Sequence, residues 1–309
     1  MLGYIAVICA VIIWGLSYIV MKTAAADYPQ VLFQFWRYAA VTAICVVCFY
    51  PSVKRIPALL WKKGLLRLGL ANFTLSLFSI YAVQHTTPTR VVVINSLIIG
   101  VVPLLRRIHY NCRPNVREKW AVGISLAAFA LMLSPGDFTL RLGDGLALAG
   151  MLGYAYSIVI MDRLLTAERS TVIQVSFLGV AGSAVYFTMA AIGYALFSPE
   201  WSSSELLPSQ PGTLAGIAYM VVFVSFAANL LQSLGQRKLP PVTVSILFCM
   251  EPAFTALLDY TLLGNRPSAA VILCGLLLVG ATSIVSVRKR EKGLINISER
   301  GDGNRQQDM

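Results

Sequence analysis

Charged residues are scarce in this sequence. Asp, Glu, Lys and Arg make up 13% of its 309 residues, whereas hydrophobic residues make up 57%. Soluble domains carry about 25% charged residues, so the composition excludes an ordinary soluble domain. Apolar runs of membrane-spanning length recur from end to end. Such runs must be helical, because hydrocarbon satisfies no exposed backbone polar group. The predicted fold class is therefore an all-α membrane protein.

Motifs for catalysis and nucleotide binding are missing as well. The sequence contains no Walker loop, no H-E-x-x-H pair and no nucleophile elbow. We therefore expect no enzyme, no ATP-driven pump and no cofactor. Cys45 and Cys48 have the spacing of a metal or redox pair but lack further ligands nearby, so we expect no metal site. The net charge of +11 lies mostly in short loops, which argues against a nucleic acid partner.

Ten apolar segments are long enough to be transmembrane helices, and an even number places both termini on one side. Lys and Arg are concentrated in alternate loops and in the C-terminal tail, with 20 on one side and 4 on the other. The positive-inside rule assigns the richer side to the cytoplasm. We expect a multi-pass protein of the cell (inner) membrane with both termini cytoplasmic. The segments are 3–21, 31–50, 64–83, 89–105, 119–134, 143–161, 171–197, 213–236, 242–263 and 268–287.

The two halves of the sequence resemble each other weakly. A shift of 140 residues aligns Ser17 with Ser157, and a shift of 153 aligns Pro88 with Pro241. One insertion in the 198–211 loop accounts for the change of offset. Five spans per half make the halves inverted relative to each other, which is an architecture of alternating-access carriers. The predicted units are 1–138, 139–290 and a disordered cytoplasmic tail, 291–309.

Two stretches resemble a known family. "WGLSYIVMKTAAADYPQVLFQFWR" (14–37) is similar to the start of an EamA-type member of the drug/metabolite transporter superfamily. "MEPAFTALLDYTLLGNRPS" (250–268) resembles the Glu-Pro helix and following turn of that family, with Asn265 where the family usually has Glu. The resemblance implies a secondary carrier (permease) for a small metabolite, such as an amino acid or related zwitterion, and efflux as its direction. The alternatives are an exporter of hydrophobic drugs or lipids and a non-transporting membrane scaffold.

Glu251 and Asp259 are two carboxylates in one apolar segment. With Thr255 they have i, i+4, i+8 spacing, so the three share a helix face. Charge near the bilayer centre costs roughly 2.5–3.5 kcal/mol on insertion scales, so this face should point into the bundle. Glu251 either contacts the substrate or exchanges protons, or it has a structural role and holds helices together beside Pro252. For Asp259 a structural role near the outer interface is favoured.

Arg37 lies about six residues inside the second segment. It can bind a substrate carboxylate with two hydrogen bonds, pair with Asp259 or Glu251, or extend toward the interface. Lys22 is interpreted as an interfacial residue and Arg90 as a loop group.

Uncharged polar and aromatic residues also recur inside the apolar segments, where each needs a partner. They either join helices or line a central cavity formed by the first, third, fourth, sixth, eighth and ninth segments. The candidate substrate-binding residues are Trp14, Ser17, Arg37, Asn72, Asn95, Tyr154, Ser157, Asn229, Gln232 and Glu251.

A stripe of small residues on the sixth segment, Gly145, Ala149, Gly153 and Ser157, is interpreted as a helix-packing surface. The expected partners of the chain are a small-molecule substrate and the lipid bilayer. Coupling to protons and assembly as a homodimer are left open.

Overall fold

Helices form all the regular secondary structure in the part of the chain that the structure describes. The computed structural model describes residues 2–111, 116–132, 141–167, 171–198, 202–229, 231 and 250–286, with no strand in these ranges. The predicted all-α class is confirmed. The elements are α1 (Leu2–Ala24), α2 (Gln30–Val53), α3 (Ala58–Lys63), η1 (Gly64–Leu68), α4 (Gly69–His85), α5 (Pro88–Asn95), α6 (Ile98–Tyr110), α7 (Val116–Met132), α8 (Leu142–Ala167), α9 (Val172–Phe197), η2 (Ser203–Glu205), α10 (Pro211–Tyr219), η3 (Met220–Ala228), α13 (Glu251–Leu263) and α14 (Ala269–Ser286).

Seven helical stretches within the described ranges are long and apolar enough to cross a membrane. Every predicted segment overlaps a helix. Residues 242–249 of the ninth segment and the tail 291–309 lie outside the described residues. The count of ten spans stays a prediction. The seven stretches are Leu2–Ala24, Gln30–Val53, Leu60–His85, Pro88–His109, Leu142–Met161, Ile173–Phe197 and Pro211–Ala228.

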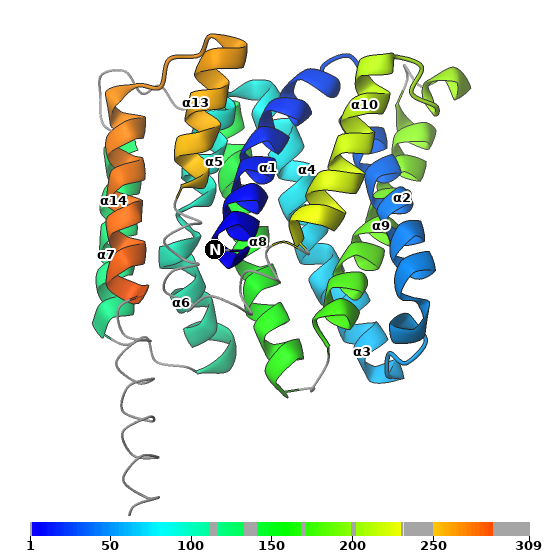
Figure 1. Cartoon of the computed structure of the whole chain (residues 1–309), viewed down its shortest axis with the longest axis horizontal. Helices are drawn as coiled ribbons and strands as arrows, with labels where there is room; N and C mark the ends of the chain where they lie inside the picture. Colours follow the sequence, from blue (N-terminus) through cyan, green and yellow to red (C-terminus); the bar gives the residue numbers. More distant parts are fainter. Residues whose placement is uncertain are drawn as a thin grey trace, which may run out of the picture.

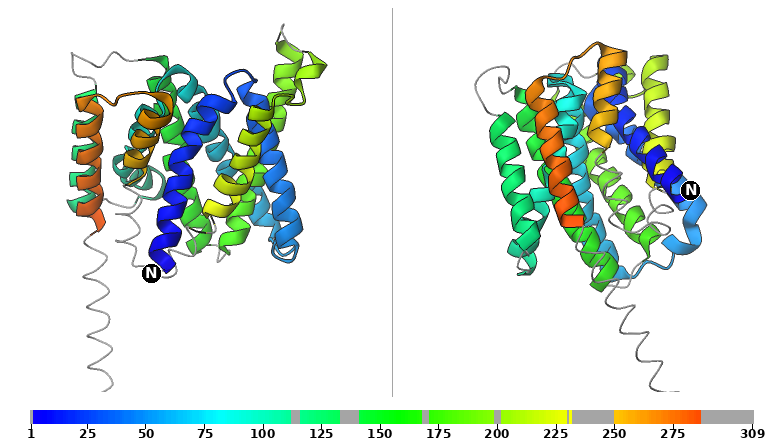
Figure 2. Two further views of the ribbon diagram at one scale, coloured as in Figure 1. Left: turned by 45° about the horizontal axis from the view of Figure 1, so that its top comes forward. Right: turned by 60° about the vertical axis from the view of Figure 1, so that its left-hand side comes forward.

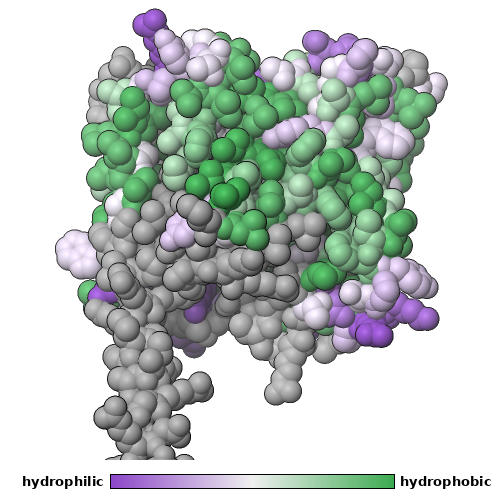
Figure 3. Space-filling view, in the orientation of Figure 1, coloured by the Kyte–Doolittle hydropathy of each residue, from purple (hydrophilic) through white to green (hydrophobic). Residues whose placement is uncertain are grey.

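The outer surface of the bundle is apolar. Figure 3 shows a hydrophobic band across the visible face, with hydrophilic residues gathered along the upper edge and at the lower right. Large apolar side chains point outward, among them Val47 at 80% and Phe197 at 84% exposure. Such a surface fits hydrocarbon rather than water, and the chain is a multi-pass membrane protein.

The helices stand roughly parallel in one bundle (Figures 1 and 2). Helices α7 and α14 pack together at one edge, and α2 and α9 pack together toward the other. Between them, α4 packs against both α8 and α9. The core includes the fully buried side chains of Phe33, Ile80 and Phe187.

Glycines allow α4 and α8 to approach closely. A Cβ added at Gly153 would lie 2.8 Å from the Leu75 backbone nitrogen, whereas one added at Gly145 would meet no described atom within 4 Å. The predicted stripe is therefore correct at Gly153 and wrong at Gly145. Each i+4 step overshoots a helical turn by about 40°, so a strict i+4 stripe rotates away from a straight partner. The packed glycines are Gly143, Gly150 and Gly153.

One predicted segment is interrupted near its middle, and the described part of another begins near its middle. The segment 89–105, predicted as continuous, breaks at Ser96 and Leu97 between α5 and α6. Helix α13 begins at Glu251, with Pro252 in its first turn. The helix starts at Ile98 and Glu251 are 153 positions apart, which equals the offset that relates the two halves. Discontinuous helices at this depth commonly flank carrier binding sites.

Helices α1 and α8 run in opposite directions. The Lys22 ammonium, near the end of α1, donates to the Thr86 carbonyl at 3.0 Å. The Thr86 hydroxyl in turn donates to Asp144, in the first turn of α8, at 3.3 Å. The end of α1 and the start of α8 therefore meet at one end of the bundle, here called the Thr86 end. Lys22 also donates to the Gln84 carbonyl at 3.3 Å, so it caps α4.

The prediction that Arg90 is a loop group is wrong. Arg90 is a buried residue of α5. Its side chain forms an ion pair with Asp144, with Nε donating to Oδ1 at 3.0 Å. Asp144 is only 1% exposed and also accepts from the Arg141 backbone N–H at 2.9 Å. The prediction failed because Arg90 was judged by its neighbours in sequence, whereas its carboxylate partner lies 54 positions away.

Candidate functional site

A cavity of about 330 Å³ lies inside the bundle. Its walls come from α1, α2, α4, α8, α9, η3 and α13. A cavity of this size with polar side chains in its wall is within the range of small-molecule sites. Eight of the ten candidate residues line it: Trp14, Ser17, Arg37, Asn72, Tyr154, Ser157, Asn229 and Glu251.

Arg37 presents a cation to this cavity. Its Nε donates to the Ser225 hydroxyl at 3.1 Å, and its Nη1 donates to the Gln34 side-chain oxygen at 3.3 Å. Gln34 is fully buried and donates to the Ser76 carbonyl at 3.0 Å, which fixes its orientation. Arginine has five N–H donors, and these two bonds occupy two of them. Its other donors have no hydrogen-bond partner among the described residues, so they can serve a ligand carboxylate in the cavity.

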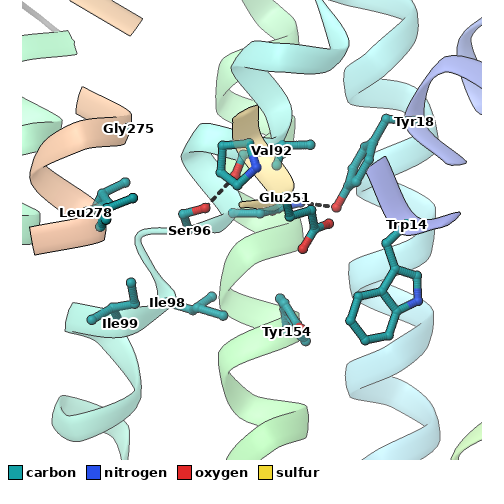
Figure 4. Close-up of a pocket in the computed structure, with 13 residues that line it drawn as sticks. Trp14, Tyr18, Val92, Ser96, Ile98, Ile99, Tyr154, Glu251, Gly275 and Leu278 are labelled. Atoms are coloured by element: carbon teal, nitrogen blue, oxygen red, sulfur yellow. Dashed lines mark hydrogen bonds between the residues drawn. The ribbon is translucent and has the colours of Figure 1, made fainter. Parts of the chain in front are cut away.

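Glu251 presents a carboxylate to the same cavity from the first turn of α13. Figure 4 shows this carboxylate projecting into the space flanked by Trp14, Tyr18 and Tyr154. Aromatic faces attract cations that approach within about 6 Å of the ring centre. The carboxylate and the three rings together form surroundings suited to an organic ammonium group.

Two serines repeat one local arrangement on α1 and α8. The Ser17 hydroxyl donates to the Trp14 carbonyl at 2.6 Å, and the Ser157 hydroxyl donates to the Tyr154 carbonyl at 2.9 Å. Both pairs line the larger cavity, and they are related by the offset of 140. Since each proton is used within its own helix, each hydroxyl oxygen offers lone pairs to the cavity.

The asparagines on the cavity wall differ in what they contact. Asn229 donates to the Ser225 carbonyl at 2.8 Å. Asn72 packs against α9, where a Cβ added at Gly179 would lie 2.8 Å from its Nδ2. Asn72 therefore contributes to helix packing as well as to the wall. Gln232 lies outside the described residues.

Asn95 lines a second, smaller cavity of about 200 Å³. This cavity lies between α1, α5, α6, α8, α13 and α14 and is mainly apolar. Four residues belong to both cavities: Trp14, Tyr18, Tyr154 and Glu251. The two cavities therefore adjoin at the Glu251 carboxylate.

Asp259 does not line either cavity. It is 1% exposed and accepts from the Thr89 hydroxyl at 2.6 Å, the Thr89 backbone N–H at 3.1 Å and Asn265 Nδ2 at 2.8 Å. The alternative of an Arg37–Asp259 ion pair is wrong, because each side chain has other partners. The contacts agree with the structural role favoured for Asp259, since they join α13 to α5.

Several wall residues were missed by sequence reasoning. Tyr18 lies one helical turn after Trp14, so the i+4 spacing of two aromatics was an available signal. Ser76, Ser79 and Ser225 are ordinary in membrane helices, and nothing in their neighbours distinguishes them. Among the described residues, no group of three His, Cys, Asp or Glu could hold a metal ion.

Comparison with known proteins identifies two matches to one family model. The model, described as the EamA-like transporter family, matches residues 1–134 and 141–287. No curated protein matches the sequence. A solved structure described only as "Crystal structure of protein" is similar to this chain with a TM-score of 0.62 at 15% identity. The similarity covers 94% of this chain and 98% of that chain, and at this identity it concerns the fold alone.

Proposed function

Since the chain belongs to the EamA-like transporter family, we propose that it is a secondary carrier that exports a small zwitterion, such as an amino acid or related metabolite. The observation that carries this proposal is one cavity lined by both Arg37 and Glu251. A zwitterion brings a carboxylate for the guanidinium and an ammonium for the carboxylate. Each such contact is a charge-assisted hydrogen bond, which is stronger than a neutral one.

Alternating access by two inverted halves is the mechanism we propose. It is supported by the opposite directions of α1 and α8 and by helix starts at Ile98 and Glu251 that are 153 positions apart. The proposed units remain 1–138 and 139–290. In this mechanism Arg37 from the first unit and Glu251 from the second hold the two ends of one substrate, so that its binding couples the units.

An exporter of hydrophobic drugs or lipids is less well supported. Such a carrier would favour a cavity with Glu251 turned away from it, whereas Glu251 lines both cavities. A scaffold without transport would have no use for a cation and an anion facing the same space within the bundle, given the cost of placing each there.

Charge removal at the site is expected to reduce transport strongly. Glu251→Gln and Arg37→Ala should each lower amino acid flux in proteoliposomes about tenfold or more, because each removes a charge-assisted contact worth about 1.5–3 kcal/mol. Matched controls are Glu118→Gln and Arg67→Ala, outside both cavities. Unchanged flux in both site variants, with folding verified by gel filtration, would remove these residues from the mechanism.

Coupling and direction are tested in the same vesicles. If Glu251 also exchanges protons, an imposed pH gradient should accelerate amino acid flux through the wild type. The same gradient should not change the flux that remains in Glu251→Gln. Comparison of inside-out and right-side-out vesicles establishes the direction of transport.

A cell protected by the protein against hydrophobic drugs, but not against toxic amino acid analogues, would favour the drug exporter.

The membrane orientation follows from the 20-to-4 distribution of Lys and Arg. We expect a fluorescent protein fused after Met309 to fluoresce in the cytoplasm, and alkaline phosphatase at the same position to be inactive. The opposite pair of results would refute the proposed cytoplasmic termini.

A further inference from the structure

The smaller cavity adjoins the proposed substrate site but is not needed to hold a zwitterion. Its walls are mainly apolar and include five aliphatic side chains, Val92, Ile98, Ile99, Leu278 and Val279. Figure 4 shows that Ile98, Ile99 and Leu278 lie on the opposite side of Glu251 from Trp14. An ammonium group held at Glu251 therefore has the serine, asparagine and Arg37 side chains of the larger cavity on one side and mainly aliphatic side chains on the other.

The volume of about 200 Å³ is large enough for a substantial apolar group. For comparison, an engineered apolar cavity of about 150 Å³ in another protein binds benzene. A single ring or a branched aliphatic chain therefore fits here.

Asn95 adds a specific polar feature to this cavity. It is 4% exposed, and its Nδ2 donates to the Tyr18 hydroxyl at 3.1 Å. Its Oδ1 is buried and has no hydrogen-bond partner among the described residues. An unpaired buried acceptor costs about 1–3 kcal/mol, so a ligand that donates to it recovers that cost.

We propose that the smaller cavity receives the apolar substituent of the substrate, and that Asn95 accepts a hydrogen bond from a donor on that substituent. The substrate class is then an amine or amino acid with a bulky, mainly apolar side group that carries one N–H or O–H. This inference rests on the proposed function for the transport step but not for the binding step, which requires only the amine.

Gly275 on α14 allows the cavity to be filled without disturbing the fold. It lines the cavity, and a Cβ added there would meet no described atom within 4 Å. Gly280 on the same helix is equally open but lines neither cavity. Gly275→Leu and Gly280→Leu are therefore a matched pair that changes the same helix with and without reducing the cavity.

The test measures transport of alanine and tryptophan in proteoliposomes, and thermal stabilisation of the purified protein by tryptamine and by methylamine. In Gly275→Leu, the concentration of tryptophan needed for half-maximal transport, and of tryptamine for half-maximal stabilisation, should rise about tenfold or more. The corresponding concentrations of alanine and methylamine should change less than about twofold. Gly280→Leu should behave as wild type. Equal losses for large and small probes, or none, would overturn the proposal.

The proposed hydrogen bond to Asn95 is tested by removing the indole N–H donor from the probe. Wild type should prefer tryptamine to 1-methyltryptamine about tenfold or more, and Asn95→Leu should lose this preference. If tryptamine binds but tryptophan is not transported, the zwitterion carrier fails while the cavity proposal stands. If neither tryptamine nor tryptophan binds to wild type, the cavity proposal fails.

Discussion

Asp144→Ala is expected to destabilise the folded protein by about 3–5 kcal/mol, because it removes the carboxylate that is ion-paired with the buried Arg90 guanidinium. The substitution also removes the acceptor for the Thr86 hydroxyl and for the Arg141 backbone N–H at the start of α8. The measurement is unfolding of the purified protein in mixed micelles, by heat or by SDS titration.

The matched control for Asp144→Ala is Glu118→Ala. Glu118 is paired with Arg106 at 3.8 Å, and the Arg106 side chain is 44% exposed. The Glu118 side chain is itself 19% exposed, and a partly exposed pair contributes about 0–1 kcal/mol, so the control should lose much less stability than Asp144→Ala. The double variant Arg90→Met/Asp144→Leu should recover much of the loss, because a buried pair replaced by apolar groups leaves no unpaired charge. Equal stability of Asp144→Ala and Glu118→Ala would contradict the assignment.

Gly182→Leu is expected to disrupt the packing of α4, η1 and α9. A Cβ at this position would lie 2.6 Å from the Leu65 carbonyl oxygen and 2.7 Å from the Gly69 Cα. Both are backbone atoms, so the helices must separate, since no side chain can rotate away. Overpacking costs about 1–3 kcal/mol and occasionally more, and backbone contact places this case at the upper end. We expect most of the monodisperse protein to be lost on gel filtration.

Gly193→Leu provides the comparison on the same helix. No described atom lies within 4 Å of a Cβ at Gly193, and leucine has a higher helix propensity than glycine by up to about 1 kcal/mol. This variant should be recovered at wild-type yield or better. If Gly182→Leu is recovered equally well, the close approach of α9 to Gly69 and Leu65 does not exist in the folded protein.

Much of the candidate site could be predicted because polar residues inside apolar segments have few options. Arg37 and Glu251 cannot face hydrocarbon without a large cost, and both line the cavity that the structure contains. Their contact with a substrate stays a prediction. The same reasoning placed Asn95 at the cavity, although it could not indicate that a second, apolar cavity begins there.

Partner choice was the part that could not be predicted. Arg90 was predicted as a loop group and is paired with Asp144, and Asp259 bonds to Thr89 rather than to Arg37. A side chain's need for a partner depends on its own chemistry, whereas the identity of that partner depends on which helices lie side by side. The break at Ser96 was missed for a similar reason, since no proline or glycine marks it in sequence.

The amino-acid sequence by itself determined that this protein is helical and membrane-embedded, because its apolar runs are continuous over a spanning length, whereas the strands of a membrane barrel alternate apolar and polar residues. It also determined which residues must avoid lipid, since that depends on each residue's charge and polarity alone. Only the tertiary structure decided how those residues combine. It places Arg37 and Glu251 around one cavity and the smaller cavity beside Glu251. It also buries two carboxylates, Asp144 and Asp259, at the Thr86 end. These arrangements depend on distances between helices that are far apart in the chain, which local composition does not encode.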